Sequence, residues 1–398
     1  MSGRHQLVEP GAAALPTSRE GRIVGVDAAR GLALVGMFAT HILPLRDEGT
    51  GALTVTGLVA DGRASALFAV LAGVGIALGT GGPRRPVDGR THLATAVSLL
   101  VRGLLVALIG LWLVGLDSPV AVILPYYGLL FAVATPLLRL PAAVLGAGAV
   151  VAGALAPVLS MVLRAGGPRG PGRQPDLAAL ADPGALLGTL ALTGYYPVLT
   201  WTTYLLAGMA VGRLDLRRTA VAVGLVVGGA GLAAAAATAS ALLLGPGGGA
   251  AALGAALDQR RYGTTPTGTW WWLAIDSPHS GAPLDLAHTT GTALAVLGVA
   301  LLVARASRAV VWVPAAAGAI PLTLYTAHVV ALSVEPGTRE GGAADVRLWA
   351  GHVLAAVVVG AVFAVLRRRG PLEAVISWAG RGVRRAVAGP DRARSGRP

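Results

Sequence analysis

Apolar residues dominate the chain in runs of about twenty residues that recur from end to end, separated by short polar segments. A run of this length crosses the ~30 Å hydrocarbon core of a bilayer as an α-helix. The pattern predicts an all-α fold, a polytopic integral membrane helical bundle with about ten transmembrane helices. We expect these helices at residues 23–43, 64–80, 92–115, 119–138, 142–163, 195–211, 219–244, 286–304, 313–334 and 346–366.

The same pattern divides the chain into one membrane domain with two tails. Residues 1–22 are expected to form a cytoplasmic N-terminal tail, residues 23–366 the membrane domain, and residues 367–398 a basic cytoplasmic C-terminal tail. The segment RRRGPLEAVISWAGRGVRRAV in this last tail fits an amphipathic helix on anionic lipid headgroups.

Small residues predict close packing between helices. The Gly-Ala-rich segment GGAGLAAAAATASALLL and the GxxxG pair of Gly75 and Gly79 are examples.

Composition supports a membrane protein and excludes several kinds of site. The chain is 54% hydrophobic and 13% charged, and a soluble chain has about twice this charged fraction. It has no cysteine, which excludes disulfides, thiolate nucleophiles and cysteine metal sites. We expect no metal, because no histidine pair stands at i, i+4 with a glutamate and the carboxylates do not cluster.

The net charge is +13, and every lysine-or-arginine position that contributes to it is an arginine. The arginines concentrate in the tails and in the loops on one side of the predicted helices. Positively charged loops face the cytoplasm, so we expect a cytoplasmic N-terminus and a multi-pass protein of the plasma membrane. These cytoplasmic arginines account for the basicity of the chain. We therefore expect membrane lipids as partners and no nucleic acid. The loop arginines are Arg84, Arg85, Arg90, Arg139, Arg213, Arg217, Arg218, Arg305 and Arg308.

The first predicted helix contains DAARGLALVGMFATH, with three ionisable residues in an apolar run. Arg30 and His41 are eleven residues apart, which is three helical turns plus about 20°. They therefore share a face, about 16 Å apart along the axis, and Asp27 lies near the same stripe. Since such residues are costly in lipid, we expect this face to line one enclosed conduit between the two sides of the membrane.

Two interpretations of the stripe stay open at this stage. In the structural one, Asp27 and Arg30 form an i, i+3 ion pair that anchors the helix, and His41 caps its outer end. In the functional one, Arg30 contacts an anion at the inner mouth and His41 is a base, because an imidazole titrates near neutral pH.

Other polar residues have two interpretations as well. Arg102, inside the third helix, either snorkels, pairs with Asp27 or binds an anion, and Tyr127 belongs either to the core or to a pocket. The Trp271 region (TWWWLAIDSPHSG) fits an aromatic belt or a stacking surface beside His279 and Asp285. His328, in TLYTAH, fits a buried histidine that is hydrogen-bonded within the bundle, or an acceptor contact; His352 fits the buried alternative more strongly.

The segment RIVGVDAARGLALVGMFATH resembles the first helix of the transmembrane acyltransferase superfamily, which has an arginine, ten residues and then a histidine. This superfamily includes heparan-alpha-glucosaminide N-acetyltransferase-like proteins and bacterial acyltransferase-3-like membrane proteins. ADGRASALFAVLAGVGIAL resembles its second helix, which opens with an aspartate, here Asp61. Later segments such as IPLTLYTAHVV are also similar, so the resemblance extends over most of the chain.

The resemblance implies an acyl-CoA-dependent O- or N-acyltransferase that takes an acetyl group from cytoplasmic acetyl-CoA. It implies His41 as the catalytic histidine and Arg30 as a contact of the CoA phosphates. From the residues themselves we expect Arg102 and Tyr127 as further donor contacts, and Asp27 as a catalytic-site residue that orients Arg30. We expect the acceptor, an envelope glycan, lipid or secreted metabolite, at Asp61, Trp271, His279, Asp285 and His328. Relatives that act on heparan sugars use a histidine in the first outer loop, and this loop (PLRDEGTGALTVTGLVADG) has none.

Two other functions remain open from the sequence. Buried charges and helices interrupted by Pro and Gly also suit a transporter or flippase. A non-catalytic scaffold would use the polar stripe only to assemble helices. The sequence also leaves open whether the chain forms a homodimer and whether an acyl-histidine intermediate precedes transfer.

Overall fold

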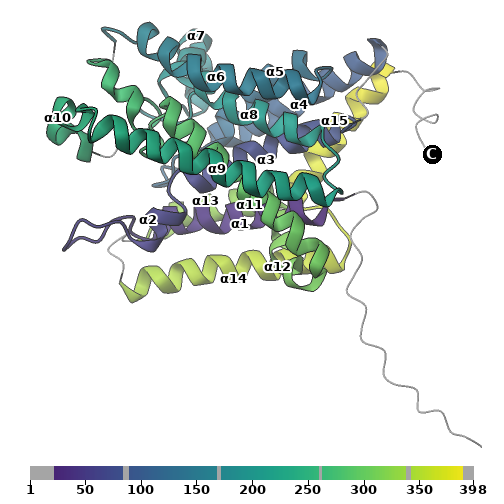
Figure 1. Cartoon of the computed structure of the whole chain (residues 1–398). Coiled ribbons are helices and arrows are strands. Elements are labelled where there is room, and N and C mark those ends of the chain that lie inside the picture. The colour runs from purple at the N-terminus through teal and green to yellow at the C-terminus, as the bar shows by residue number, and fades with distance from the viewer. Residues whose placement is uncertain (1–21, 84–88, 168–171, 260–261, 338–341, 389–398) are drawn as a thin grey trace, which may run out of the picture.

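The computed structural model describes residues 22–83, 89–167, 172–259, 262–337 and 342–388, which form a bundle of helices (Figure 1). The prediction of an all-α membrane bundle is confirmed. The principal helices are α1 (Val24–Ile42), α3 (Arg63–Gly79), α4 (Gly89–Val114), α5 (Leu124–Ala134), α6 (Ala142–Leu163), α8 (Val198–Gly212), α9 (Thr219–Leu244), α11 (Pro283–Ala306), α12 (Arg308–Gly318), α13 (Pro321–Val334), α14 (Ala343–Val365) and α15 (Pro371–Ala388), with short helices α2 (Val55–Val59), α7 (Pro183–Gly188) and α10 (Gly249–Leu253).

Each of the ten predicted segments contains a helix, but the described helices are not all full spans. Six are long and apolar enough to cross a membrane: α2 together with α3, α4, α6, α9, α11 and α14. A seventh span is possible if α12 and α13 count as one broken crossing. The other three, α1, α5 and α8, are shorter or less apolar. In α1 the cause is the buried polar stripe itself.

The predicted span 313–334 is not one straight helix. α12 and α13 meet at an angle of 61°, and Ile320 between them has φ −133° and ψ 47°, outside the helical region. The cause is Pro321 at the start of α13, because proline disfavours helical geometry in the residue before it. This bend brings Gly318 onto the first turn of α1, where any side chain would overlap the carbonyl oxygen of Asp27.

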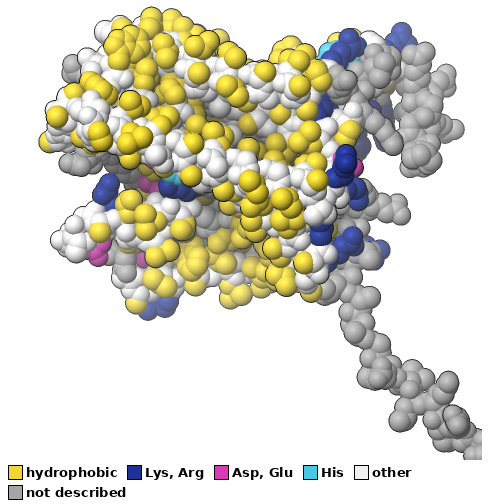
Figure 2. All heavy atoms as spheres, viewed as in Figure 1, with side chains coloured by type: hydrophobic (Ala, Val, Ile, Leu, Met, Phe, Trp, Pro, Cys, Tyr) yellow, Lys and Arg dark blue, Asp and Glu magenta, His cyan; other side chains and the backbone are white. Residues whose placement is uncertain are grey.

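The helix α1 lies in the middle of the bundle (Figure 1), and α3, α11, α12 and α14 all pack against it. Asp27, Leu34, Phe38 and Ile42 are all buried. The outer helices α6, α9 and α14 instead expose large apolar side chains, which appear as a broad hydrophobic surface in Figure 2. This arrangement shields the polar stripe of α1 from lipid.

Arginines tie the helix ends together at one end of the bundle, where most of those visible in Figure 2 gather. Arg213 donates hydrogen bonds to the carbonyl oxygens of Ala77 and Gly82, linking α8 to the end of α3. Arg305 of α11 donates hydrogen bonds to the Leu216 carbonyl oxygen in the α8–α9 loop and to the Thr219 hydroxyl at the start of α9. The predicted N-terminal tail up to residue 21, Arg84, Arg85 and residues 389–398 lie outside the described residues.

Glycines allow close packing, although not at every position that the sequence indicated. A Cβ on Gly208 would overlap the Val70 carbonyl oxygen, and one on Gly229 would lie 2.6 Å from that of Gly291. These contacts bring α8 onto α3 and α9 onto α11. The predicted packing role of Gly75 and Gly79 is wrong: Gly75 faces the Arg30 guanidinium, and Gly79 has open space.

Candidate active site

A cavity of about 270 Å³ opens beside the first turns of α1, between α3, α4 and α5. Its walls are mainly apolar, but three arginine side chains reach them: Arg30 from α1, Arg102 from α4 and Arg384 from α15. We call this the inner cavity because it lies toward the arginine-rich end of the bundle. Its apolar residues are Phe68, Leu71, Ala72, Ile76, Leu99, Val106, Leu124, Phe131, Pro321 and Leu322.

Arg30 is held in place by an ion pair and by the shape of α3. Its Nη1 lies 3.1 Å from Oδ1 of Asp27, whose other oxygen lies 2.8 Å from Nε of Arg22. Its Nη2 donates a hydrogen bond to the Leu71 carbonyl oxygen at 3.5 Å. A Cβ at Gly75 would lie only 2.7 Å from this nitrogen. The predicted Asp27–Arg30 pair is therefore present, and it leaves Arg30 at the cavity wall.

The other side of the inner cavity is completed by the C-terminal helix, which packs along α4. A Cβ at Gly380 would lie 2.5 Å from Arg102 Nε, so this glycine allows α15 to approach the arginine. The predicted C-terminal amphipathic helix thus exists, and it contributes Arg384 to the cavity. The alternative pairing of Arg102 with Asp27 is not seen, since Asp27 pairs with Arg22 and Arg30.

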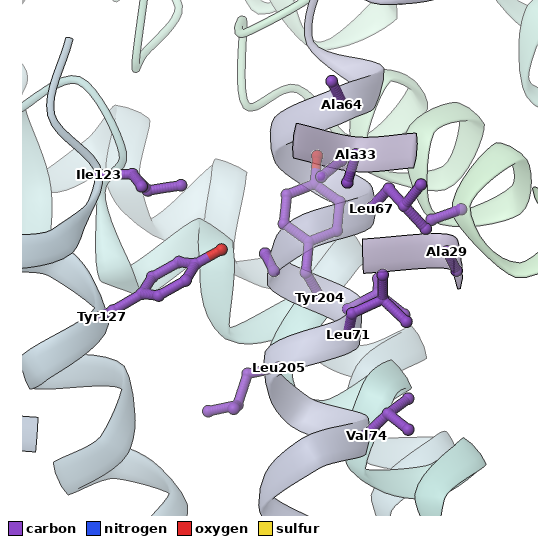
Figure 3. Close-up of a cluster of buried hydrophobic side chains, with 14 of the residues drawn as sticks. Ala29, Ala33, Ala64, Leu67, Leu71, Val74, Ile123, Tyr127, Tyr204 and Leu205 are labelled. Carbon is purple, nitrogen blue, oxygen red and sulfur yellow. The ribbon is translucent and has the colours of Figure 1, made fainter. Parts of the chain in front are cut away.

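Two polar atoms near this cavity have no hydrogen-bond partner among the described residues: Nε of Arg102 and the hydroxyl of Tyr127. Both are buried at the atom level, and an unpaired buried polar group is costly. Figure 3 shows the Tyr127 hydroxyl directed away from α5 toward α3. Both residues line the inner cavity.

A second cavity of about 230 Å³ lies farther along α1, and we call it the outer cavity. His41 lines it from α1 and Asp61 from the start of α3, with His279 opposite. Phenol and amide groups add further hydrogen-bonding capacity. These are Tyr195, Tyr196, Tyr262, Tyr325 and Gln174.

His279 is positioned by an unusual backbone. Its φ is 61°, in the left-handed region that non-glycine residues seldom adopt, and such conformations concentrate at functional sites. Its Nε2 lies 3.4 Å from Oδ1 of Asp61. The approach depends on Gly62, with φ +68°, where a Cβ would lie 2.8 Å from Pro278.

The two cavities meet at Tyr325, which lines both of them. Its ring is buried, and its hydroxyl accepts a hydrogen bond of 3.4 Å from the backbone N–H of Ile123. The expected single conduit is therefore two cavities with one shared wall residue. Arg30 belongs to the inner cavity, and His41 belongs to the outer one.

Behind His41 lies His328, which is buried and stacks on Phe38 with ring centres 3.9 Å apart. The Nδ1 of His41 and the Nε2 of His328 are 3.1 Å apart. His328 thus contacts His41 rather than lining the cavity where we expected it to meet an acceptor.

Two other expected acceptor residues also lie elsewhere. Trp271 borders a separate, more open cavity with Leu243 and Pro283. Asp285 is buried and accepts hydrogen bonds from the Gly281 N–H at 2.9 Å and the Ser280 hydroxyl at 3.2 Å, so it fixes the turn before α11.

Nearby, Asp276 in the loop before that turn accepts a hydrogen bond of 3.1 Å from His288 of α11. This bond holds the pKa of the Asp276 carboxyl below its usual value.

Several residues of the two cavities were missed by the sequence analysis. Arg384 was assigned to a helix on the membrane surface, but this helix, α15, packs against α4. The apolar face of the amphipathic segment was the available signal for such packing. Tyr262 and Gln174 come from loops, where no periodicity marks an inward-facing position, and Tyr196 lies just before α8 rather than within the predicted helix 195–211.

Among the described residues, no group of three or more His, Asp or Glu side chains could hold a metal ion.

The family of the chain follows from comparison with known proteins. A search of curated proteins finds no match. A family model described as heparan-alpha-glucosaminide N-acetyltransferase, catalytic, matches residues 22–239, from before α1 into α9. The match includes Arg30, His41 and Asp61, and it spans more than half of the chain. The chain therefore belongs to the heparan-alpha-glucosaminide N-acetyltransferase catalytic family, and it is a membrane acetyltransferase in general class.

Proposed function

We propose that this protein transfers an acetyl group from cytoplasmic acetyl-CoA to a hydroxyl or amine of an acceptor that enters from the opposite face of the plasma membrane. One observation carries the proposal: the cavity with the arginines and the cavity with the histidine base share the wall residue Tyr325. A donor and an acceptor that enter from opposite ends would meet there.

The inner cavity fits the chemistry of the donor. Arg30, Arg102 and Arg384 suit phosphate groups, because guanidinium groups bind phosphate through several charge-assisted hydrogen bonds. The apolar walls suit the thin pantetheine arm, and the unpaired Arg102 Nε and Tyr127 hydroxyl suit its amides. Asp27 acts through Arg30, whose guanidinium it orients.

The reaction needs one base at the acceptor and one exit for the thiol. His41 takes the proton from the acceptor hydroxyl or amine, whose lone pair then forms a bond to the thioester carbonyl carbon. The carbon–sulfur bond breaks, and the departing thiolate takes up a proton, so the products are the acetylated acceptor and free CoA thiol. Direct transfer needs no acyl-enzyme, and the shared wall residue Tyr325 between the two cavities supports it.

The outer cavity fits a hydroxyl-rich or amine-bearing acceptor such as an envelope glycan, a lipid headgroup or a secreted metabolite. Asp61, His279 and the surrounding tyrosines offer both donors and acceptors of hydrogen bonds. The first outer loop has no histidine. The acceptor is therefore proposed by chemistry and not taken from the heparan-specific relatives.

Labelled acetyl-CoA tests the proposal with purified protein in lipid nanodiscs. The wild type should bind acetyl-CoA and hydrolyse it slowly without acceptor. His41→Ala should bind it but lose at least about 100-fold of this thioester cleavage, and Arg30→Ala should weaken binding.

A transporter is the second candidate, because two cavities separated by one residue also suit access from alternate sides. Substrate movement across proteoliposomes that is independent of acetyl-CoA would favour the transporter and overturn the enzyme. Neither activity would favour a scaffold.

A further inference from the structure

Three histidines from three helices form a continuous chain of hydrogen bonds that starts at the outer cavity. His328 in α13 contacts His41 through its Nε2 at 3.1 Å. It contacts His352 in α14 through its Nδ1, with Nδ1 to Nδ1 of 2.9 Å. Both ring nitrogens of His328 are therefore engaged, and its ring is fixed between its neighbours by the stacked ring of Phe38.

This chain has a direction. A neutral imidazole has one N–H and one bare nitrogen, so a neutral His328 donates to one neighbour and accepts from the other. If His41 donates from Nδ1 to His328, then His328 must donate from Nδ1 to His352. If the direction is reversed, His352 donates inward and His41 must accept at Nδ1.

Only the first direction makes His41 a base toward the cavity. With its proton on Nδ1, the other ring nitrogen of His41, Nε2, has the lone pair that can take a proton from an acceptor. In the reverse direction Nε2 already holds a proton. His352 is the end of the chain, half-buried on α14, and in the first direction it accepts at Nδ1 as the Nε2–H tautomer.

We infer that His328 and His352 are positioning residues that hold His41 in its Nδ1–H tautomer, as the buried carboxylate does for the histidine of a catalytic triad. The chain also spreads the positive charge that His41 acquires when it takes up the acceptor proton. The inference rests on the proposed role of His41 as base, and it assigns to α13 and α14 a function that the matched residues 22–239 do not include.

The test uses ¹⁵N-histidine NMR on the full chain in nanodiscs, at a pH where the histidines are neutral. The chemical shift of each ring nitrogen reports whether it is protonated, and single substitutions assign the signals. His352→Leu removes the terminal acceptor, whereas His352→Asn retains an amide oxygen that can take the place of Nδ1. His92→Leu is the matched control, because His92 is another half-buried histidine on a different helix.

We expect His41 to be the Nδ1–H tautomer in the wild type, in His352→Asn and in His92→Leu. In His352→Leu its Nε2 should become protonated in a substantial fraction of molecules. Acetyl transfer should then fall by about tenfold in kcat with an unchanged KM for acetyl-CoA, and His352→Asn should restore most of it. A purely structural role of His352 would not move the tautomer of His41.

Two results would overturn the inference: a wild-type His41 protonated on Nε2, or a tautomer that is the same in His352→Leu and the wild type. These results are distinguishable from a failure of the proposed function. If the tautomers respond as expected but no variant cleaves acetyl-CoA, the histidine chain stands and the acetyl-CoA proposal fails. If cleavage depends on His41 but the tautomers do not respond, the acetyl-CoA proposal stands and the inference about the histidine chain fails.

Discussion

Arg30 and His41 lie on the same face of α1, yet they line different cavities that share only Tyr325 as a common wall residue. Their eleven-residue spacing places them about 16 Å apart along the helix. A guanidinium and an imidazole are thereby presented to two separate ligands by one rigid element. The helix can hold this polar stripe because α3, α11, α12 and α14 pack around it.

The first prediction concerns the fit of Arg30 against α3. Gly75→Ala places a methyl group 2.7 Å from Arg30 Nη2 unless the guanidinium moves. We expect KM for acetyl-CoA to rise by about tenfold, which corresponds to the loss of one charge-assisted hydrogen bond. Gly79→Ala is the matched control, because it also adds a methyl group to the cavity wall but has open space around it. Equal effects of the two variants would contradict a specific role of the Arg30 position.

The second prediction concerns the partition between the cavities. Tyr325→Ala removes the ring that both cavities share, so water from the outer cavity should reach the thioester more readily than in the wild type. Hydrolysis of acetyl-CoA without acceptor should rise several-fold relative to transfer, measured as free thiol against acetylated product. Tyr325→Phe retains the ring and loses only the hydrogen bond to Ile123. Tyr325→Phe should keep the wild-type ratio of free thiol to acetylated product. An unchanged ratio in Tyr325→Ala would show that the ring does not separate the two cavities.

The third prediction concerns the outer cavity. Asp61→Asn removes the charge that faces His279 at 3.4 Å. We expect KM for the acceptor to rise by about tenfold while KM for acetyl-CoA stays within twofold, as measured by steady-state kinetics with both substrates varied. Asp276→Asn serves as the control, because that aspartate does not line this cavity. A change confined to the donor KM would place Asp61 on the wrong side of the site.

Sequence periodicity was sufficient to predict the fold and the polar face of α1. Because the helical period fixes which residues share a face, Asp27, Arg30 and His41 could be placed together before any tertiary contact was known. The period says nothing about what closes a cavity. Tyr325 and His328 reach the site from α13, nearly three hundred residues after α1, and their placement depends on the bend at Pro321.

The same limit applies to the residues that the structure places apart from the two cavities. Trp271 and Asp285 are near His279 in sequence, but Trp271 borders another cavity and Asp285 accepts hydrogen bonds from the turn before α11. Gly75 and Gly79 have the spacing of a packing motif, and only the fold shows that an arginine occupies the space beside Gly75.

The fourth prediction concerns pH and the Asp276–His288 hydrogen bond. The pKa of Asp276 is lowered in the folded protein. Its ionised form therefore adds stability above the unfolded pKa of ~3.9, and this contribution disappears as the pH falls through the folded pKa. Since the carboxyl is partly exposed, Asp276→Asn should cost less than about 1 kcal/mol at pH 7. The difference in Tm from wild type should shrink as the pH falls from about 5 to about 3. Glu48→Gln, at an exposed carboxylate in another outer loop, should show no such narrowing.

The central claim is that the donor occupies the inner cavity and the acceptor the outer cavity, on either side of Tyr325. The absence of cysteine in the native chain allows a direct measurement with Ser98→Cys in the inner cavity and Ser65→Cys in the outer one. Each variant is reacted with a small thiol reagent in nanodiscs, with and without CoA. The account predicts that CoA slows labelling of Ser98→Cys and leaves the rate for Ser65→Cys unchanged. Protection of Ser65→Cys by CoA without protection of Ser98→Cys would contradict it.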